Sequence, residues 1–78
     1  MYNRYENFPR RHVTITPHNT NKLDKPYIIV AGTDGNISAV DDTGIEVIYA
    51  VTAGSVLPIM PEIIKATGTT VTQIIGVY

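Results

Sequence analysis

The sequence contains no cysteine and no tryptophan, and charged residues make up only 17% of its 78 positions. Without cysteine, disulfide bonds and thiolate zinc sites are excluded. His12 and His18 are the only histidines, which is too few for a metal site built from histidine alone. No segment approaches the ~20 apolar residues of a membrane span, and residues 1–12 lack the apolar core of a secretory signal. We therefore expect synthesis in the cytoplasm, with no metal, cofactor or membrane partner.

The shortness of the chain limits the stability that it can reach alone. It forms one domain at most, and burying about 60% of its unfolded surface would contribute on the order of 115 kcal/mol. Ordering the chain costs about the same amount, at ~1.5 kcal/mol per residue. Small domains usually gain the missing stability from disulfides, metals or association. Because 44% of the residues are apolar, we expect association, either between copies or with a larger partner.

The charges are unevenly divided along the chain. Residues 1–22 carry four basic side chains against Glu6, a net charge of +3, whereas residues 23–78 carry two lysines against six acids, a net charge of −4. A basic N-terminal part therefore precedes an acidic body. Nucleic-acid-binding modules usually present a broad basic face, so the mildly acidic whole favours a protein partner over a nucleic acid.

Short apolar and alternating segments predict an all-β fold. Turn residues separate these segments at intervals typical of a small antiparallel β-sandwich or barrel of about seven short strands. Gly44, at the end of the turn at 41–44, supplies the positive φ that hairpin loops require. The expected strands are His12–Thr16, Tyr27–Ala31, Asn36–Val40, Ile45–Thr52, Ser55–Met60, Glu62–Thr67 and Thr72–Tyr78.

Four of these strands carry more specific expectations. Ile45–Thr52 has the strongest alternation, and Tyr49 lies on its apolar face, where a core position is the simplest interpretation. Ser55–Met60 contains Pro58, which predicts an edge strand or a bulged one. The last two strands, at 62–67 and 72–78, are expected to pair with each other across the turn at 68–70.

Residues 1–11 do not follow the strand pattern and are interpreted as an extended N-terminal arm, preceding a single β domain at 12–78. Aromatic residues and arginines dominate the cores of protein interfaces. An arm rich in both is suited to lying in a groove on another subunit. We expect it to be a docking arm, with the candidate contact residues Tyr2, Arg4, Tyr5, Phe8, Arg10 and Arg11.

Residues that could carry catalysis lack the partners that catalysis needs. Ser38 and Ser55 fall within expected strands, and no Gly-x-Ser-x-Gly turn surrounds either one. No glycine-rich loop resembles a phosphate-binding loop. The sequence therefore predicts a protein that is not an enzyme and has no catalytic residues.

Acidic residues near the expected turns have two interpretations. Asp34, Asp41, Asp42 and Glu46 could converge as ligands for calcium. Aspartate also favours turns because its carboxylate accepts hydrogen bonds from nearby backbone amides. We favour turn formation, and the sequence leaves calcium open.

The C-terminal third carries a resemblance to a known family. The segment Ala53–Tyr78 is similar to the end of the head-spike base proteins of gene transfer agents and related tailed phages, where Gly-Ser/Thr-x-Leu-Pro precedes an aliphatic strand and Ala-Thr-Gly-Thr-Thr. Ile15–Leu23 resembles the Ile-Thr-Pro-Ser-Asp-Thr-x-x-Leu element of that family, with His18 and Asn19 in place of Ser-Asp. The matching positions in the C-terminal segment are Gly54, Ser55, Leu57, Pro58, Ala66, Thr67, Gly68, Thr69 and Thr70.

The resemblance implies a virion structural protein on the capsid surface. Such a subunit is the base of a head spike or a capsid decoration protein that links the shell to a fibre. It implies a homo-oligomer, with a pentamer favoured and a trimer as the alternative, whose partners are the major capsid protein and a spike or fibre protein. The arm would then grip the capsid, and a chain without residues 1–11 would fold but no longer bind capsids.

Two other functions remain compatible with the sequence. A tail or baseplate component of the same kind of particle would show the same features. A receptor- or carbohydrate-binding module usually presents exposed aromatic residues, and outside the arm only Tyr27, Tyr49 and Tyr78 are available.

Overall fold

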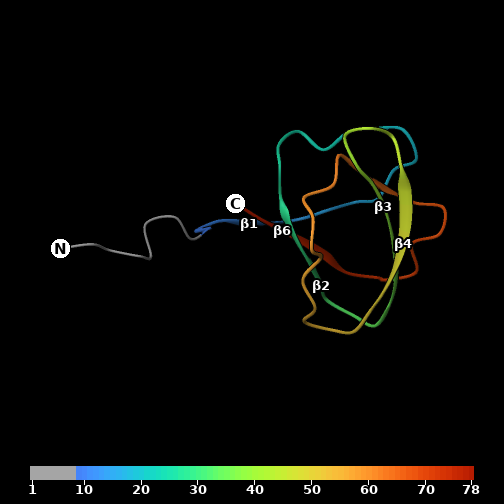
Figure 1. Cartoon of the computed structure of the whole chain (residues 1–78). Helices are drawn as coiled ribbons and strands as arrows, with labels where there is room; N and C mark the ends of the chain where they lie inside the picture. Colours follow the sequence, from blue (N-terminus) through green and yellow to red (C-terminus); the bar gives the residue numbers. More distant parts are fainter. Residues whose placement is uncertain (1–8) are drawn as a thin grey trace.

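The computed structural model describes residues 9–78, and throughout these residues the fold is all-β. Figure 1 shows the chain winding into a small two-layered body, with the C-terminus beside the first described residues. Six strands form: β1 (His12–Thr14), β2 (Ile28–Ala31), β3 (Gly35–Val40), β4 (Glu46–Val51), β5 (Ile63–Lys65) and β6 (Ile74–Val77). The described part contains no helix that could cross a membrane.

The first sheet has the strand order β1-β6-β2, with both neighbours antiparallel to β6. Gly76 lies at the centre of this sheet, and its missing side chain is what allows close packing there. A Cβ on Gly76 would lie 2.9 Å from Ile15 Cδ1 and 2.9 Å from the Tyr27 ring. Ile15, directly after β1, and Tyr27, directly before β2, therefore cover the glycine.

The second sheet has the strand order β4-β3-β5, again antiparallel throughout. The turn at 41–44 joins β3 to β4 as a hairpin, and Gly44 there has a φ of 90°, as the sequence predicts. The registers place Ile37 opposite Tyr49 and Ala39 opposite Ile64. The central strand β3 is the most buried element of the protein.

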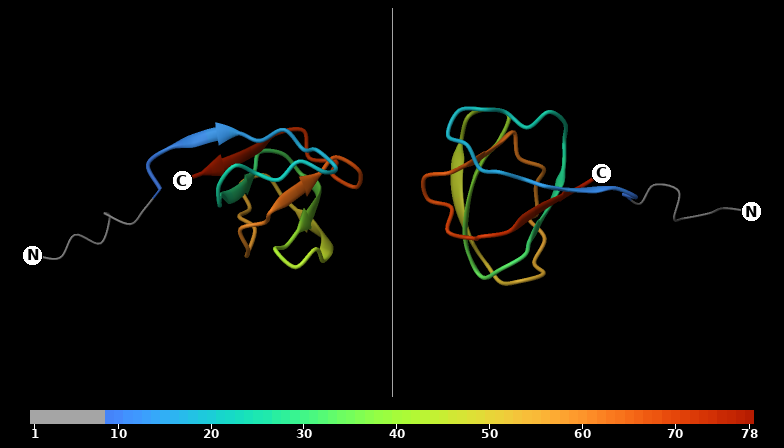
Figure 2. Two further views of the ribbon diagram at one scale, coloured as in Figure 1. Left: turned by 90° about the horizontal axis from the view of Figure 1, so that it is seen from above. Right: turned by 180° about the vertical axis from the view of Figure 1, so that it is seen from behind.

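The two sheets stack face to face, and the apolar side chains between them form the core. Figure 2 shows β1 and β6 in one layer and β4 in the other. The expectation of a small antiparallel β-sandwich is thereby confirmed, with six strands in place of about seven. The core consists of Ile15, Tyr27, Ile29, Ala31, Ile37, Ala39, Leu57, Ile64, Val71 and Ile74.

One strand prediction was wrong in part and another entirely. Ser55–Met60 lies at the outer edge of β2, as predicted, but it forms one isolated bridge, between Val30 and Val56, in place of a strand, because Pro58 has no N–H to continue a ladder. The segments at 62–67 and 72–78 do not pair with each other, since β5 lies in the second sheet and β6 in the first. The turn between them is held by β3, because the backbone N–H of Thr70 donates to the Asn36 carbonyl at 2.8 Å.

Candidate interaction surface

The edge strand β4 exposes apolar side chains on both of its faces. Val47 is 46% exposed on one face and Ile48 is 55% exposed on the other, and Ile45, just before the strand, is 61% exposed. Tyr49 is half-buried and packs against the core, so only part of the expected apolar face of this strand is covered. Exposed apolar residues gathered on one strand are typical of a surface that a partner covers.

An apolar groove of about 620 Å³ runs beside β4, on the face that carries Val47 and Tyr49. The segments 23–26 and 59–62 form its other walls. Met60 is 61% exposed at its mouth. Its lining consists of Leu23, Lys25, Pro26, Ala39, Asp41, Asp42, Ile45, Val47, Tyr49, Ile59, Met60, Pro61 and Glu62.

The end of the groove at the β3–β4 turn is negatively charged. Glu62 is paired with Lys22 at 2.8 Å, and the ammonium group of Lys25 lies 4.1 Å from the centre of the Tyr78 ring. No ion pair involves Asp41 or Asp42 within residues 9–78. The groove therefore combines an apolar floor with two carboxylates that lack a cation among the described residues.

Asp41 organises the turn that carries these two carboxylates. Its Oδ1 accepts hydrogen bonds from the Thr43 hydroxyl at 2.7 Å, the Thr43 N–H at 2.8 Å and the Ile45 N–H at 3.0 Å. The bonds from Thr43 and Ile45 lower the pKa of Asp41, so the group is ionised at neutral pH. This is the turn chemistry that we favoured for the aspartates. Asp34 instead accepts from the distant Ala53 N–H at 2.7 Å. In the part of the chain that the structure describes, no three acidic or histidine side chains gather as metal ligands.

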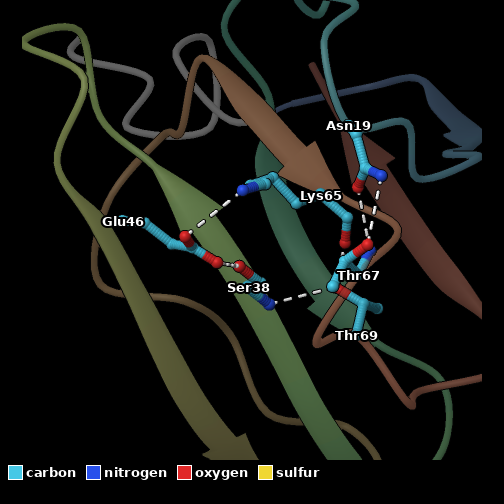
Figure 3. Close-up of polar contacts among 6 residues, drawn as sticks. All are labelled: Asn19, Ser38, Glu46, Lys65, Thr67 and Thr69. Carbon is cyan, nitrogen blue, oxygen red and sulfur yellow. Dashed lines mark hydrogen bonds and ion pairs between the residues drawn. The ribbon is translucent and has the colours of Figure 1, made fainter.

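A polar network fixes β4 to the rest of its sheet (Figure 3). The buried Ser38 hydroxyl donates to Glu46, whose other carboxylate oxygen lies 3.3 Å from Lys65 Nζ. The Thr69 hydroxyl donates to the Lys65 carbonyl at 2.5 Å and accepts from the Ser38 N–H at 3.0 Å. The network thus joins β4, β3 and β5, and it holds one wall of the groove in place.

The same network explains the Ala-Thr-Gly-Thr-Thr segment. Thr67 exchanges two hydrogen bonds with the Asn19 side chain, at 2.9 Å and 3.1 Å, and Gly68 adopts a φ of 93° that favours glycine. The Thr70 hydroxyl accepts from the Asn36 N–H at 2.8 Å. The segment is therefore a turn that anchors β3, and each threonine hydroxyl has a structural partner.

Acidification is expected to weaken this anchoring. The hydrogen bond from Ser38, followed by that from Lys65, lowers the pKa of Glu46, and Thr43 and Ile45 lower that of Asp41. A carboxylate with a lowered folded-state pKa stabilises the fold fully above its ordinary pKa of about 4, and the stabilisation is lost as the pH falls through the folded value. The denaturant concentration at the unfolding midpoint should therefore decrease as the pH falls below about 4. In a Glu46→Gln variant this midpoint should depend less on pH. An equal dependence on pH in both proteins would contradict this role for Glu46.

The comparisons with known proteins identify the chain's relatives. No protein-family model matches it, and no curated protein matches it. Among solved structures, a chain of the structure described as the capsid of a native gene transfer agent particle, computed with C5 symmetry, matches with a TM-score of 0.82. The two sequences are 38% identical, and the match covers 90% of this chain and 83% of that one. The chain belongs to the family of this capsid chain.

Membership of this family confirms the broader part of the resemblance found in the sequence. The relation to gene transfer agent capsids extends over nearly the whole chain. The resemblance in the sequence rests on the Ile15–Leu23 element and the C-terminal segment. In the structure these two regions meet, because Asn19 binds Thr67 and the Ile15 N–H donates to the Ile74 carbonyl at 2.8 Å. The two segments that carry the resemblance therefore form one structural unit.

The docking-arm residues divide into two groups. Arg10 and Arg11 are exposed, and their N–H groups donate to the Tyr78 carbonyl at 3.1 Å and 2.8 Å. The Tyr78 N–H donates back to the Arg11 carbonyl at 2.9 Å, so this part of the predicted arm lies alongside the C-terminus. The remaining candidates, Tyr2, Arg4, Tyr5 and Phe8, lie outside the described residues.

The groove itself was missed by the sequence analysis. Its signal was present in the alternation of Ile45, Val47 and Tyr49, which was interpreted as a core face. The second wall comes from residues 59–62, which were expected to belong to strands or their ends. Only the folded arrangement shows that the two segments leave a gap between them.

Proposed function

We propose that the protein is a virion structural subunit: the base of a capsid head spike, or a decoration subunit that links the capsid shell to a fibre. The observation that carries this proposal is the 38% identity to a chain of the gene transfer agent capsid, over 90% of this chain and with the same fold. We place the protein on the capsid surface, and we assign it no catalytic step.

The proposed subunit works as a symmetric homo-oligomer, with a pentamer favoured over a trimer. The related capsid was computed with C5 symmetry, and a fivefold ring would match that symmetry. A ring also buries apolar surface that a small chain leaves exposed, such as Val47 and Met60. Its partners are the major capsid protein on one side and a spike or fibre protein on the other, with no nucleic acid or membrane involved.

The N-terminal arm, residues 1–11, serves in this proposal as the segment that docks onto a partner subunit. The exposure of Arg10 and Arg11 at the point where the arm joins the β domain supports this role. Residues 9–11, where the arm joins the β domain, lie on the side of the sandwich away from β4 (Figure 1).

Deletion of the gene tests the function directly. Particles produced without this protein should have complete, DNA-filled shells that lack fibres at the positions where wild-type particles carry them. A complementing copy of the gene should restore the fibres. Electron micrographs in which fibre numbers are unchanged by the deletion would rule out the base role, and loss of tails with intact head fibres would place the protein in the tail.

A further inference from the structure

Two sheet edges are left uncovered within residues 9–78. The outer edge of β2 is covered by residues 54–57, through bonds such as that from the Leu57 N–H to the Ile29 carbonyl at 2.9 Å. The outer side of β5 is covered in the same way by residues 18–23. The remaining edges are those of β1 and β4. An uncovered edge flanked by exposed apolar side chains is a pairing hazard unless a partner occupies it.

The charges beside these two edges are opposite. Arg10 and Arg11 directly precede β1, and neither forms an ion pair with another described residue. Asp41 and Asp42 lie in the turn between β3 and β4 at the end of the groove, and they likewise have no cationic partner among the residues described. Guanidinium groups pair well with carboxylates because their donors match the carboxylate geometry.

Backbone hydrogen bonds fix the two arginines at the end of the first sheet. Three bonds join residues 10 and 11 to Tyr78, as an extension of the β1–β6 ladder. Residues 9–11 lie on the side of the body away from β4 in both Figure 1 and Figure 2. A complementary pair of surfaces on opposite sides of one molecule suits head-to-tail contact between copies, which generates a ring when the rotation closes.

We propose that the groove beside β4 receives the N-terminal segment of a second copy of this chain, with the neighbour's Arg10 and Arg11 facing Asp41 and Asp42. The apolar floor formed by Ile45, Val47, Met60 and their neighbours takes aromatic side chains of that segment. This inference rests on the proposed function, because it names the contact that builds the ring. In this inference the arm first binds another copy of the chain, and the assembled ring then binds the capsid shell.

Charge exchange between two variants tests the contact in the full-length chain. Arg10→Glu/Arg11→Glu reverses the charge of the arm, and Asp42→Lys neutralises the groove rim, because Asp41 and its turn stay intact. Each variant alone should self-associate on the order of tenfold more weakly, because the charge attraction between arm and rim is lost. Mixing the two should restore part of the association, because the acidic arm meets the lysine introduced at the rim and the unchanged arm meets the unchanged rim. Analytical ultracentrifugation at micromolar concentration measures both effects.

A matched pair of neutral positions tests the groove floor. Met60 and Val56 are similarly exposed, at 61% and 56%, but only Met60 lines the groove. Met60→Arg should abolish self-association, because it places a cation in the apolar floor that the neighbour's aromatic side chains cover. Val56→Arg should leave it unchanged. Equal effects of the two substitutions would overturn the assignment of the groove.

The outcomes separate this inference from the proposed function. The mixture could associate as weakly as each variant alone, with association restored only when both substitutions are in one chain. That result would show that the arm binds its own groove, and it would overturn the inference. Normal self-association of the arm variant together with loss from particles shows that the arm binds the capsid protein, which overturns the inference and keeps the function. A wild-type chain that is monomeric at micromolar concentration overturns the inference as well. Absence of the wild-type protein from particles overturns the function.

Discussion

Replacing Ile37 with alanine is expected to unfold the isolated protein. Ile37 is fully buried in the central strand β3, where it faces the opposite sheet. Truncation of a buried isoleucine costs about 2–5 kcal/mol, because apolar contacts are lost and a cavity remains. Small domains have total stabilities near the low end of about 5–15 kcal/mol, and this chain has no disulfide to add to its own. Circular dichroism and urea titration should show little or no folded population at 37 °C.

The matched control is Ile48→Ala. The two positions carry the same side chain, but Ile48 is 55% exposed on the edge strand β4. We expect a change within about 0.5 kcal/mol, as for most surface substitutions. A comparable loss of stability at both positions would mean that the face of β4 carrying Ile48 is covered in solution, which would revise the core as described.

Removing residues 1–11 is expected to leave a folded protein that no longer enters particles. The truncation removes the hydrogen bonds of Arg10 and Arg11 to Tyr78. It keeps the whole β1–β6 pairing, from His12 opposite Val77 to Thr14 opposite Ile75, so the sandwich should persist. Without its arm the subunit cannot engage a neighbour, and its copy number in purified particles should fall more than tenfold, as for loss of a dominant interface anchor.

The control for this deletion keeps the arm and its charge. Arg10→Lys/Arg11→Lys should enter particles with at most a modest loss, since lysine preserves the charge but lacks the guanidinium geometry. Quantitative mass spectrometry of purified particles measures both variants. Wild-type copy numbers for the truncated chain would show that docking does not depend on the arm.

The sequence was sufficient for most of the fold because its signals are local. Alternation located β3 and β4, and the turn at 41–44 with Gly44 gave the hairpin between them. The pairing of the last two strands was wrong because the Gly68–Thr70 turn has the composition of a hairpin. Its threonines instead bind the more distant Asn36 and Ser38. A turn that bonds to residues about thirty positions away therefore has the same local composition as a hairpin turn that joins two paired strands.

The interaction surface was less accessible to sequence reasoning. An apolar alternation such as that of Ile45 and Val47 is the same whether the strand faces the core or a partner molecule. Exposure was decided by topology, because β4 is an edge strand and the loop at 59–62 does not cover it. The charge asymmetry was visible from the outset, but its counterpart, the Asp41–Asp42 rim beside an apolar groove, exists only in the folded chain.

A reconstruction of the intact particle tests the central claim most directly. The account predicts copies of this β-sandwich arranged symmetrically on the outer face of the capsid, each with β4 and its groove turned toward the N-terminal segment of the next copy. Shells with no density for this fold, in preparations where mass spectrometry detects no trace of the chain, would contradict its assignment as a capsid subunit.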